Sequence, residues 1–176
     1  LVEAGIDPKA ALEIGILDTF LPSIEARLAR EKRERGEIDY DDMLVWVARA
    51  LEQEHAEAML SKLRARFRYA LIDEFQDTDY LQWRIFRRAF LESDGQTRLF
   101  LVGDPKQAIY AFRGADVYAY LAAKRELTQQ YQVAPVPLVR NFRSTGDLIE
   151  ALNLILDQTA APPLFSGEIQ YHNPAL

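Results

Sequence analysis

The apolar residues of the first third of the chain recur at helical spacing and predict three helices. Residues 8–37 form the first, in which Ile24 and Leu28 share a face before an almost wholly charged stretch of mixed sign. That stretch is typical of a solvated helix face, although a nucleic-acid contact is an alternative. A second helix opens at Asp39, and a third covers about residues 54–66. The chain is therefore expected to begin as a helical segment.

Beyond residue 68 the hydrophobic period shortens, and strands alternate with helices. A strand, a helix and a second strand follow one another closely enough to form a crossover unit, so the two strands should be parallel neighbours. The expected strands cover residues 69–75, 98–102 and 136–139, the expected helices cover 80–91, 117–129 and 147–156, and a loop or short edge strand follows from residue 160. This pattern predicts an α/β fold with a parallel sheet flanked by helices.

Composition restricts the classes of function. The net charge of −6 argues against nucleic-acid binding through overall charge, but residues 104–145 carry six Lys/Arg against three Asp/Glu and offer a local basic face. The chain has no cysteine, which excludes disulfides and thiolate catalysis and fits a cytoplasmic protein. No apolar run approaches the roughly 20 residues of a membrane span. Because the chain begins at Leu1 rather than at Met, we expect it to belong to a longer protein.

An adjacent carboxylate pair follows the first expected strand. The stretch YALIDEFQD ends in Asp73 and Glu74, with Gln76 and Asp77 close behind. At the carboxyl end of a buried strand, an aspartate can hold Mg²⁺ through its water shell, and the glutamate beside it can activate a water aimed at a terminal phosphate. The alternative is that the pair only caps the following helix.

A second polar segment, VGDPKQAIYAFRGAD, follows the neighbouring strand. Gln107 can donate to a phosphate oxygen, while Tyr110, Phe112 and Arg113 offer two aromatic faces and a guanidinium within four residues. Bases of a single-stranded nucleic acid stack on such aromatics. The alternative is that the two aromatic side chains belong to the hydrophobic core.

A third segment, VRNFRST, again lies between an expected strand and an expected helix. Its Arg143 suits an arginine finger, which reaches the terminal phosphate of a nucleotide across a cleft. The alternative is an ordinary ion pair with a surface carboxylate, which would contribute little to stability.

In this order and spacing, the three segments resemble motifs II, III and IV of the UvrD/RecB branch of superfamily-one DNA helicases. The stretch DYDDML, residues 39–44, is similar to the sequence that precedes motif II in that family, so the resemblance covers about residues 39–156. It implies a partial RecA-like NTPase domain at 39–140, preceded by the end of an inserted helical subdomain at 1–38 and followed by the start of a second RecA-like domain at 141–176.

The resemblance also implies roles for individual residues. Asp73 would bind Mg²⁺ together with Glu74, which would activate water; Gln107 would sense the γ-phosphate of ATP, Arg143 would be the finger, and Phe142 would stack near the nucleotide base. Tyr110 and Phe112 would stack on single-stranded DNA, and Gln76 and Arg113 would help to couple the two sites. The sequence of the second segment is most similar to that of the RecBCD-type exodeoxyribonuclease V members of the family. This similarity implies RecC- and RecD-like partner subunits and a role in DNA repair and recombination. It also implies movement along single-stranded DNA in the 3′-to-5′ direction.

One essential motif is absent. A P-loop needs G-x-x-x-x-G-K-[ST], and none of the five lysines follows a glycine. We therefore expect a fragment with little ATP turnover of its own. Two other interpretations remain open: a UvrD/Rep-type helicase without a nuclease, and a noncatalytic relic of the ATPase that acts as a DNA-binding or interaction module.

Overall fold

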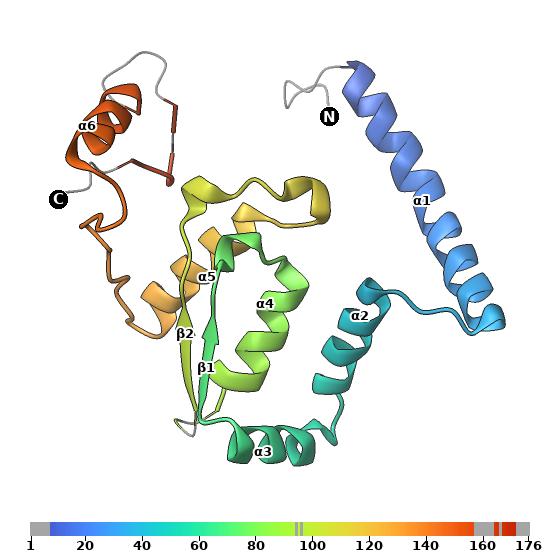
Figure 1. The fold of residues 1–176 in the computed structure, drawn as a ribbon. Coiled ribbons are helices and arrows are strands. Elements are labelled where there is room, and N and C mark those ends of the chain that lie inside the picture. Colours follow the sequence, from blue (N-terminus) through green and yellow to red (C-terminus); the bar gives the residue numbers. More distant parts are fainter. Residues whose placement is uncertain (1–7, 94, 96, 157–163, 166, 172–176) are drawn as a thin grey trace. The chain divides into compact units, whose positions relative to one another are not determined.

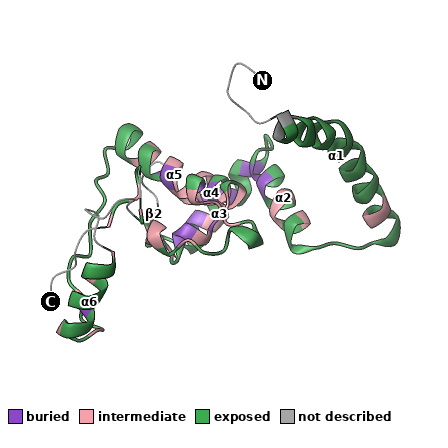
Figure 2. Ribbon diagram, turned by 90° about the horizontal axis from the view of Figure 1, so that it is seen from above, coloured by how far each residue is buried: buried purple, intermediate pink, exposed green. Residues whose placement is uncertain are grey.

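The computed structural model describes residues 8–93, 95, 97–156, 164–165 and 167–171 (Figure 1). The chain divides into two compact units, residues 1–46 and 47–176, and each is described by itself. Buried residues lie in α2, α3 and α5 and at one position of α4, whereas α1 is exposed along most of its length (Figure 2). The three domain boundaries expected from the sequence stay predictions.

The first unit contains α1 (Pro8–Arg35) and the first part of α2 (Tyr40–Leu51). Asp39 and Asp42 form a reciprocal cap at the start of α2, because each carboxylate accepts the backbone N–H of the other residue, at 2.9 and 3.0 Å. Lys32 of α1 pairs with both carboxylates. These hydrogen bonds raise the pKa of Lys32 and lower the pKa of Asp39. The reciprocal cap confirms the expected aspartate-rich helix start.

The second unit is built on two parallel strands, β1 (Tyr69–Ile72) and β2 (Arg98–Leu101), paired in the register Ile72↔Leu101. Between them run α4 (Tyr80–Phe86) and a π-helical turn (Arg87–Leu91), so the expected crossover unit is confirmed. The remaining helices are α3 (Ala56–Arg66), α5 (Val117–Gln130) and α6 (Gly146–Ile155). Each lies within about two residues of its expected range.

Helices α4 and α5 pack against one face of this sheet. Phe75, Trp83 and Ala123 form the buried centre, and Ile72 of β1 and Leu99 of β2 pack on it from the strands. The rings of Phe75 and Trp83 meet edge to face at 5.6 Å between centroids, a favoured aromatic geometry. This cluster holds the segment after β1 against the helices.

The other face of the sheet is exposed, which corrects the expectation that the first strand is buried. Leu71 of β1 and Phe100 of β2 are paired neighbours, and both are exposed in the described structure. The strands therefore alternate between covered and uncovered residues, as strands do when only one face has a helical layer.

The expected third strand at 136–139 does not form. Val136 and Leu138 are 88% and 89% exposed, and no regular strand is assigned there in the described structure. Pro135 and Pro137 remove two backbone donors from this stretch, so it cannot complete a ladder of hydrogen bonds within a sheet. The apolar alternation that suggested a strand belongs to an extended connection.

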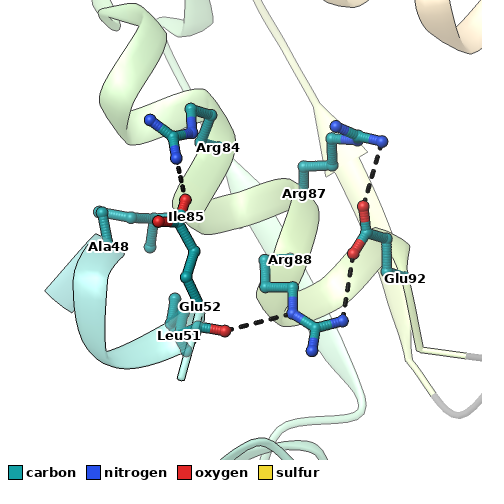
Figure 3. Close-up of a pocket in the computed structure, with 8 residues that line it drawn as sticks. All are labelled: Ala48, Leu51, Glu52, Arg84, Ile85, Arg87, Arg88 and Glu92. Carbon is teal, nitrogen blue, oxygen red and sulfur yellow. Dashed lines mark hydrogen bonds and ion pairs between the residues drawn. The ribbon is translucent and has the colours of Figure 1, made fainter. Parts of the chain in front are cut away.

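Three arginines of α4 and the π-helical turn line a shallow hollow, shown in Figure 3. Arg84 pairs with Glu52, while Arg87 and Arg88 reach Glu92 at 3.1 and 3.3 Å. Arg87 also pairs with Glu126 and Arg88 with Glu57, at 2.7 and 2.6 Å. Because every guanidinium has at least one carboxylate partner, the hollow carries no uncompensated positive charge for a ligand. It is best understood as an ion-pair network that fixes the end of α4.

Replacing Trp83 with alanine is expected to destabilise the second unit by about 3–5 kcal/mol. The side chain is 2% exposed, contacts Phe75 and donates from its indole N–H to Glu126 at 3.3 Å, so truncation leaves a cavity and an unpaired acceptor. Urea unfolding of the chain measures the change. The matched control is Trp46→Ala, at a residue 53% exposed, which should stay within about 0.5 kcal/mol; equal losses for both variants would contradict the packing described here.

Candidate functional site

The acidic pair lies on a tight turn directly after β1. The strand ends at Ile72, and Glu74 adopts a left-handed backbone conformation with φ 50° and ψ 42°. This conformation costs a non-glycine residue about 1 kcal/mol or more, so surrounding contacts must hold it. The Asp73 carboxylate accepts the Glu74 N–H at 2.9 Å, and the Phe75 N–H donates to the Val102 carbonyl at 2.9 Å. The turn is thereby fixed to the segment that follows β2.

This geometry removes the simple capping interpretation of the acidic pair. Helix α4 is capped by Asp79, whose carboxylate accepts the N–H of Gln82 at 2.7 Å while the Gln82 side chain accepts the Asp79 N–H at 3.2 Å. Asp73 and Glu74 take no part in this capping box. Their exposed carboxylates remain available at the end of the strand.

Gln76 connects the acidic turn to the segment after β2. Its side chain is 1% exposed; the amide nitrogen donates to Glu74 Oε2 at 2.7 Å, and the amide oxygen accepts the Asp104 N–H at 2.9 Å. The absence of a side chain at Gly103 is required here, because a Cβ would lie 2.7 Å from Gln76 Oε1 and 3.0 Å from the Phe75 nitrogen. The structure therefore brings the first two polar segments together.

Asp104 organises the second polar segment. It caps the short 3₁₀ turn Pro105–Gln107, pairs with the Lys106 ammonium at 2.7 Å and accepts from the Gln107 amide at 3.3 Å. Burial opposes ionisation of Asp104, but the hydrogen bonds from Lys106 and Gln107 outweigh it and hold the pKa of this carboxyl below its ordinary value. Asp104 is thus an anion that keeps Gln107 near the acidic turn.

An exposed aromatic group follows that turn. The rings of Tyr110 and Phe112 lie 6.0 Å apart, and the Arg113 guanidinium sits 5.4 Å from the centroid of each. Phe112 is 77% exposed, so the alternative that these aromatics are core residues is wrong. The guanidinium covers part of each ring, and the exposed Phe112 side chain keeps ring surface accessible to a planar ligand.

The third polar segment forms its own local turn. The Asn141 side-chain oxygen accepts the backbone N–H groups of Arg143 and Ser144 at 2.9 and 3.0 Å. Phe142 and Arg143 are exposed. No ion pair is formed by Arg143 within the described part of the chain, and no hydrogen bond there joins this turn to Glu74 or Gln107. Two of the three predicted segments therefore meet in the structure.

The acidic turn offers two exposed carboxylates of the kind that bind Mg²⁺. No group of three or more His, Cys, Asp or Glu residues gathers as a closed metal cage among the residues described. Mg²⁺ usually takes only one or two carboxylates and completes its coordination with phosphate oxygens and water. The exposed Asp73 and Glu74 carboxylates match that donor set.

Sequence reasoning included Gly103 and Asp104 in the second polar segment but gave neither of them a role in the site. A glycine directly after the second strand, facing the residues that follow the first, was the available signal. The glycine matters because a side chain there would collide with the buried Gln76 amide, and the position of that amide is known only from the folded chain.

Comparisons with known proteins agree with these observations. Residues 15–128 match the model of the UvrD/REP helicase N-terminal domain, and the chain belongs to this family. It is 44% identical to the RecBCD enzyme subunit RecB of Escherichia coli over 144 residues, which are 82% of this chain and 12% of that protein. The RecB subunits of Mycolicibacterium smegmatis and Haemophilus influenzae are 36% and 33% identical, over 93% and 84% of this chain and 14% and 12% of theirs.

These relatives confirm the resemblance to the UvrD/RecB branch and the partial RecA-like fold. The chain spans about an eighth of the length of the curated relatives named above. In the described part of the chain, no helix has both the length and the apolar character that crossing a membrane requires.

Proposed function

We propose that this chain is part of an ATP-dependent DNA helicase of the RecBCD type, which tracks 3′ to 5′ on single-stranded DNA during repair and recombination. The observation that carries the proposal is the link from Glu74 through Gln76 to Asp104, since it places an acidic pair and Gln107 at one edge of a parallel sheet. Nucleotides bind at this edge in open α/β sheets. The RecB relatives support the same assignment.

In this proposal Glu74 is the general base that takes a proton from the attacking water. Asp73 and Glu74 would hold Mg²⁺, which supplies positive charge to the phosphate oxygens of ATP when it is bound. Gln107 would donate to the γ-phosphate through its amide, which has a second N–H besides the one donated to Asp104. Arg143 would neutralise charge that develops on the transferred phosphoryl group, and Phe142 would stack near the base.

The aromatic group of Tyr110, Phe112 and Arg113 would bind single-stranded DNA. Tyr110 and Phe112 offer ring faces to bases, and Arg113 adds a positive charge for the phosphate backbone. Because this group begins only three residues after Gln107, movement of the 3₁₀ turn on ATP hydrolysis would move it as well. Arg113 and Gln76 would in this way couple the nucleotide site to the DNA site.

The remaining parts of the motor lie outside this sequence in our proposal. The phosphate-binding P-loop is absent, so the isolated chain should turn over little ATP. RecC- and RecD-like subunits would be its partners in the cytoplasm, by analogy with the relatives, which are named as subunits of RecBCD. The same absence motivates a second candidate, a noncatalytic DNA-binding or interaction module.

Hydrolysis of ATP by the full-length protein that carries this chain tests the proposal. The expected result is MgATP hydrolysis that rises when single-stranded DNA is added, together with ATP-dependent unwinding of a duplex with a 3′ single-stranded tail. DNA binding without any hydrolysis would favour the noncatalytic module instead.

Replacing Phe112 with alanine should weaken binding of single-stranded DNA by about 1–3 kcal/mol, the contribution of one stacked base. Its ring is exposed and borders the Arg113 guanidinium, so truncation removes a stacking face without opening the core. Fluorescence anisotropy with a labelled oligonucleotide measures the affinity at fixed salt. Tyr118→Ala, at another exposed aromatic residue, is the control and should bind normally; equal losses for the two variants would argue against a specific stacking site.

A further inference from the structure

We infer that Gln76 is a positioning residue for the Glu74 carboxylate, and that Gly103 is the glycine that makes its position possible. The inference rests on the proposed role of Glu74 as general base. Gln76 itself is buried, so it acts on the reaction through Glu74 and not by touching a substrate.

The Glu74 side chain needs such a support. Glutamate has several rotatable bonds, and Glu74 stands on an exposed turn in a left-handed backbone conformation. A general base must keep its carboxylate within hydrogen-bond reach of the water that it activates. The 2.7 Å bond from Gln76 is the one side-chain hydrogen bond that the described structure gives the Glu74 carboxylate. It fixes Oε2 and leaves Oε1 to face a water.

The orientation of the Gln76 amide is set from its other end. The backbone N–H of Asp104 can only donate a hydrogen bond. The amide atom of Gln76 that lies 2.9 Å from it must therefore be the oxygen. The amide nitrogen must then point at Glu74. A neutral amide donor at this position stabilises a carboxylate without supplying a proton that could neutralise it.

Space for this arrangement comes from Gly103. A Cβ at residue 103 would lie 2.7 Å from Gln76 Oε1, which is closer than real Cβ contacts allow, with the Phe75 backbone nitrogen at 3.0 Å behind it. The amide oxygen would have to leave the Asp104 N–H. A side chain at position 103 is therefore expected to displace the Gln76 amide without removing any polar group.

Two substitutions of Gln76 separate positioning from a purely structural tether. Gln76→Glu keeps the volume and an acceptor for the Asp104 N–H, but it replaces the donor to Glu74 with an oxygen. Gln76→Met keeps the volume and loses both hydrogen bonds. If Gln76 positions Glu74, both variants of the full-length protein lose about 10- to 100-fold in kcat for DNA-stimulated ATP hydrolysis, while KM for ATP changes by less than about threefold.

Dependence on Glu74 is tested in the same assay. In a Glu74→Gln background, adding Gln76→Glu should lower the residual turnover by less than about twofold, because the group that Gln76 positions is already absent. Binding of a fluorescent ATP analogue and thermal unfolding are measured for each variant. Gly103→Ala should reproduce a loss of kcat with ATP binding retained, and Gly15→Ala, in α1 with no atom within 4 Å of the added Cβ, should not.

The outcomes separate this inference from the proposed function. Near-normal kcat for Gln76→Glu with a loss for Gln76→Met would show a structural tether and overturn the inference, and so would full additivity with Glu74→Gln. Either result leaves the motor intact. A wild-type protein without ATP hydrolysis, or one indifferent to Glu74→Gln, would overturn the proposed function and this inference with it. Should the Gln76 variants fail to fold, unchanged kcat in Gly103→Ala would overturn the inference.

Discussion

Replacing Glu74 with glutamine should lower DNA-stimulated ATP turnover by the full-length protein about 10²- to 10⁴-fold, the contribution of a general base. The two side chains have the same shape, and the amide oxygen of the new glutamine can still accept the hydrogen bond from Gln76. The substitution therefore removes the proton acceptor while the turn after β1 keeps its contacts. Steady-state hydrolysis with saturating single-stranded DNA measures the loss.

Nucleotide binding distinguishes a chemical defect from a folding defect in this variant. A fluorescent ATP analogue should still bind Glu74→Gln, since Asp73 and the proposed phosphate contacts are unchanged and the amide oxygen of the new glutamine can replace one carboxylate oxygen as a Mg²⁺ ligand. Glu54→Gln, at an exposed glutamate between α2 and α3, is the matched control and should hydrolyse ATP normally. Turnover by Glu74→Gln within about twofold of the wild type would remove Glu74 from the reaction.

The local elements of the fold could be predicted because each rests on short-range chemistry. The aspartates at the start of α2 and before α4 accept backbone N–H groups near them in sequence, and both helices begin where those residues stand. The spacing of β1 and β2 required a crossover, and the strands are parallel. In the same way, three polar segments placed after expected strands were sufficient to indicate the family, which the comparisons confirm.

Long-range side-chain packing could not be predicted in the same way. The hydrogen bonds of Gln76 with Glu74 and Asp104 join residues up to 28 positions apart. The helical or strand periodicity of the sequence does not predict such contacts. The strand expected at 136–139 does not form, for a related reason. Alternating apolar residues predict a strand only where a partner strand can pair with them, and two prolines reduce the donors available for pairing.

The turn that carries Arg143 shows both what the sequence predicts and what only the structure reveals. Its sequence predicts a polar connection before a helix, and α6 begins at Gly146, one residue before the expected start. The structure adds that Asn141 holds the backbone at Arg143 and Ser144, so the arginine projects from an ordered turn. No ion pair of its guanidinium is found among the described residues. An unpaired guanidinium on an ordered turn is suited to an incoming phosphate.

Replacing Arg143 with alanine should therefore lower kcat for ATP hydrolysis by about 10³-fold or more, the range in which arginine fingers contribute. Arg143→Lys should recover only part of this loss, because an ammonium keeps the charge but lacks the planar pair of donors that matches phosphate oxygens. Single-turnover hydrolysis of radiolabelled ATP by the full-length protein measures the chemical step directly.

Arg140, three residues upstream, offers the matched control for this substitution. Arg140→Ala removes the same charge from the same connection and should leave hydrolysis within about threefold of the wild type. If both variants lose turnover equally, the effect comes from the general positive potential of this segment. Such an effect should weaken as salt is added, because salt at about 0.1 M screens exposed charges over about 10 Å. A loss confined to Arg143→Ala and insensitive to added salt would place the guanidinium in direct contact with the transferred phosphate, and a kcat unchanged in Arg143→Ala would exclude it from the reaction.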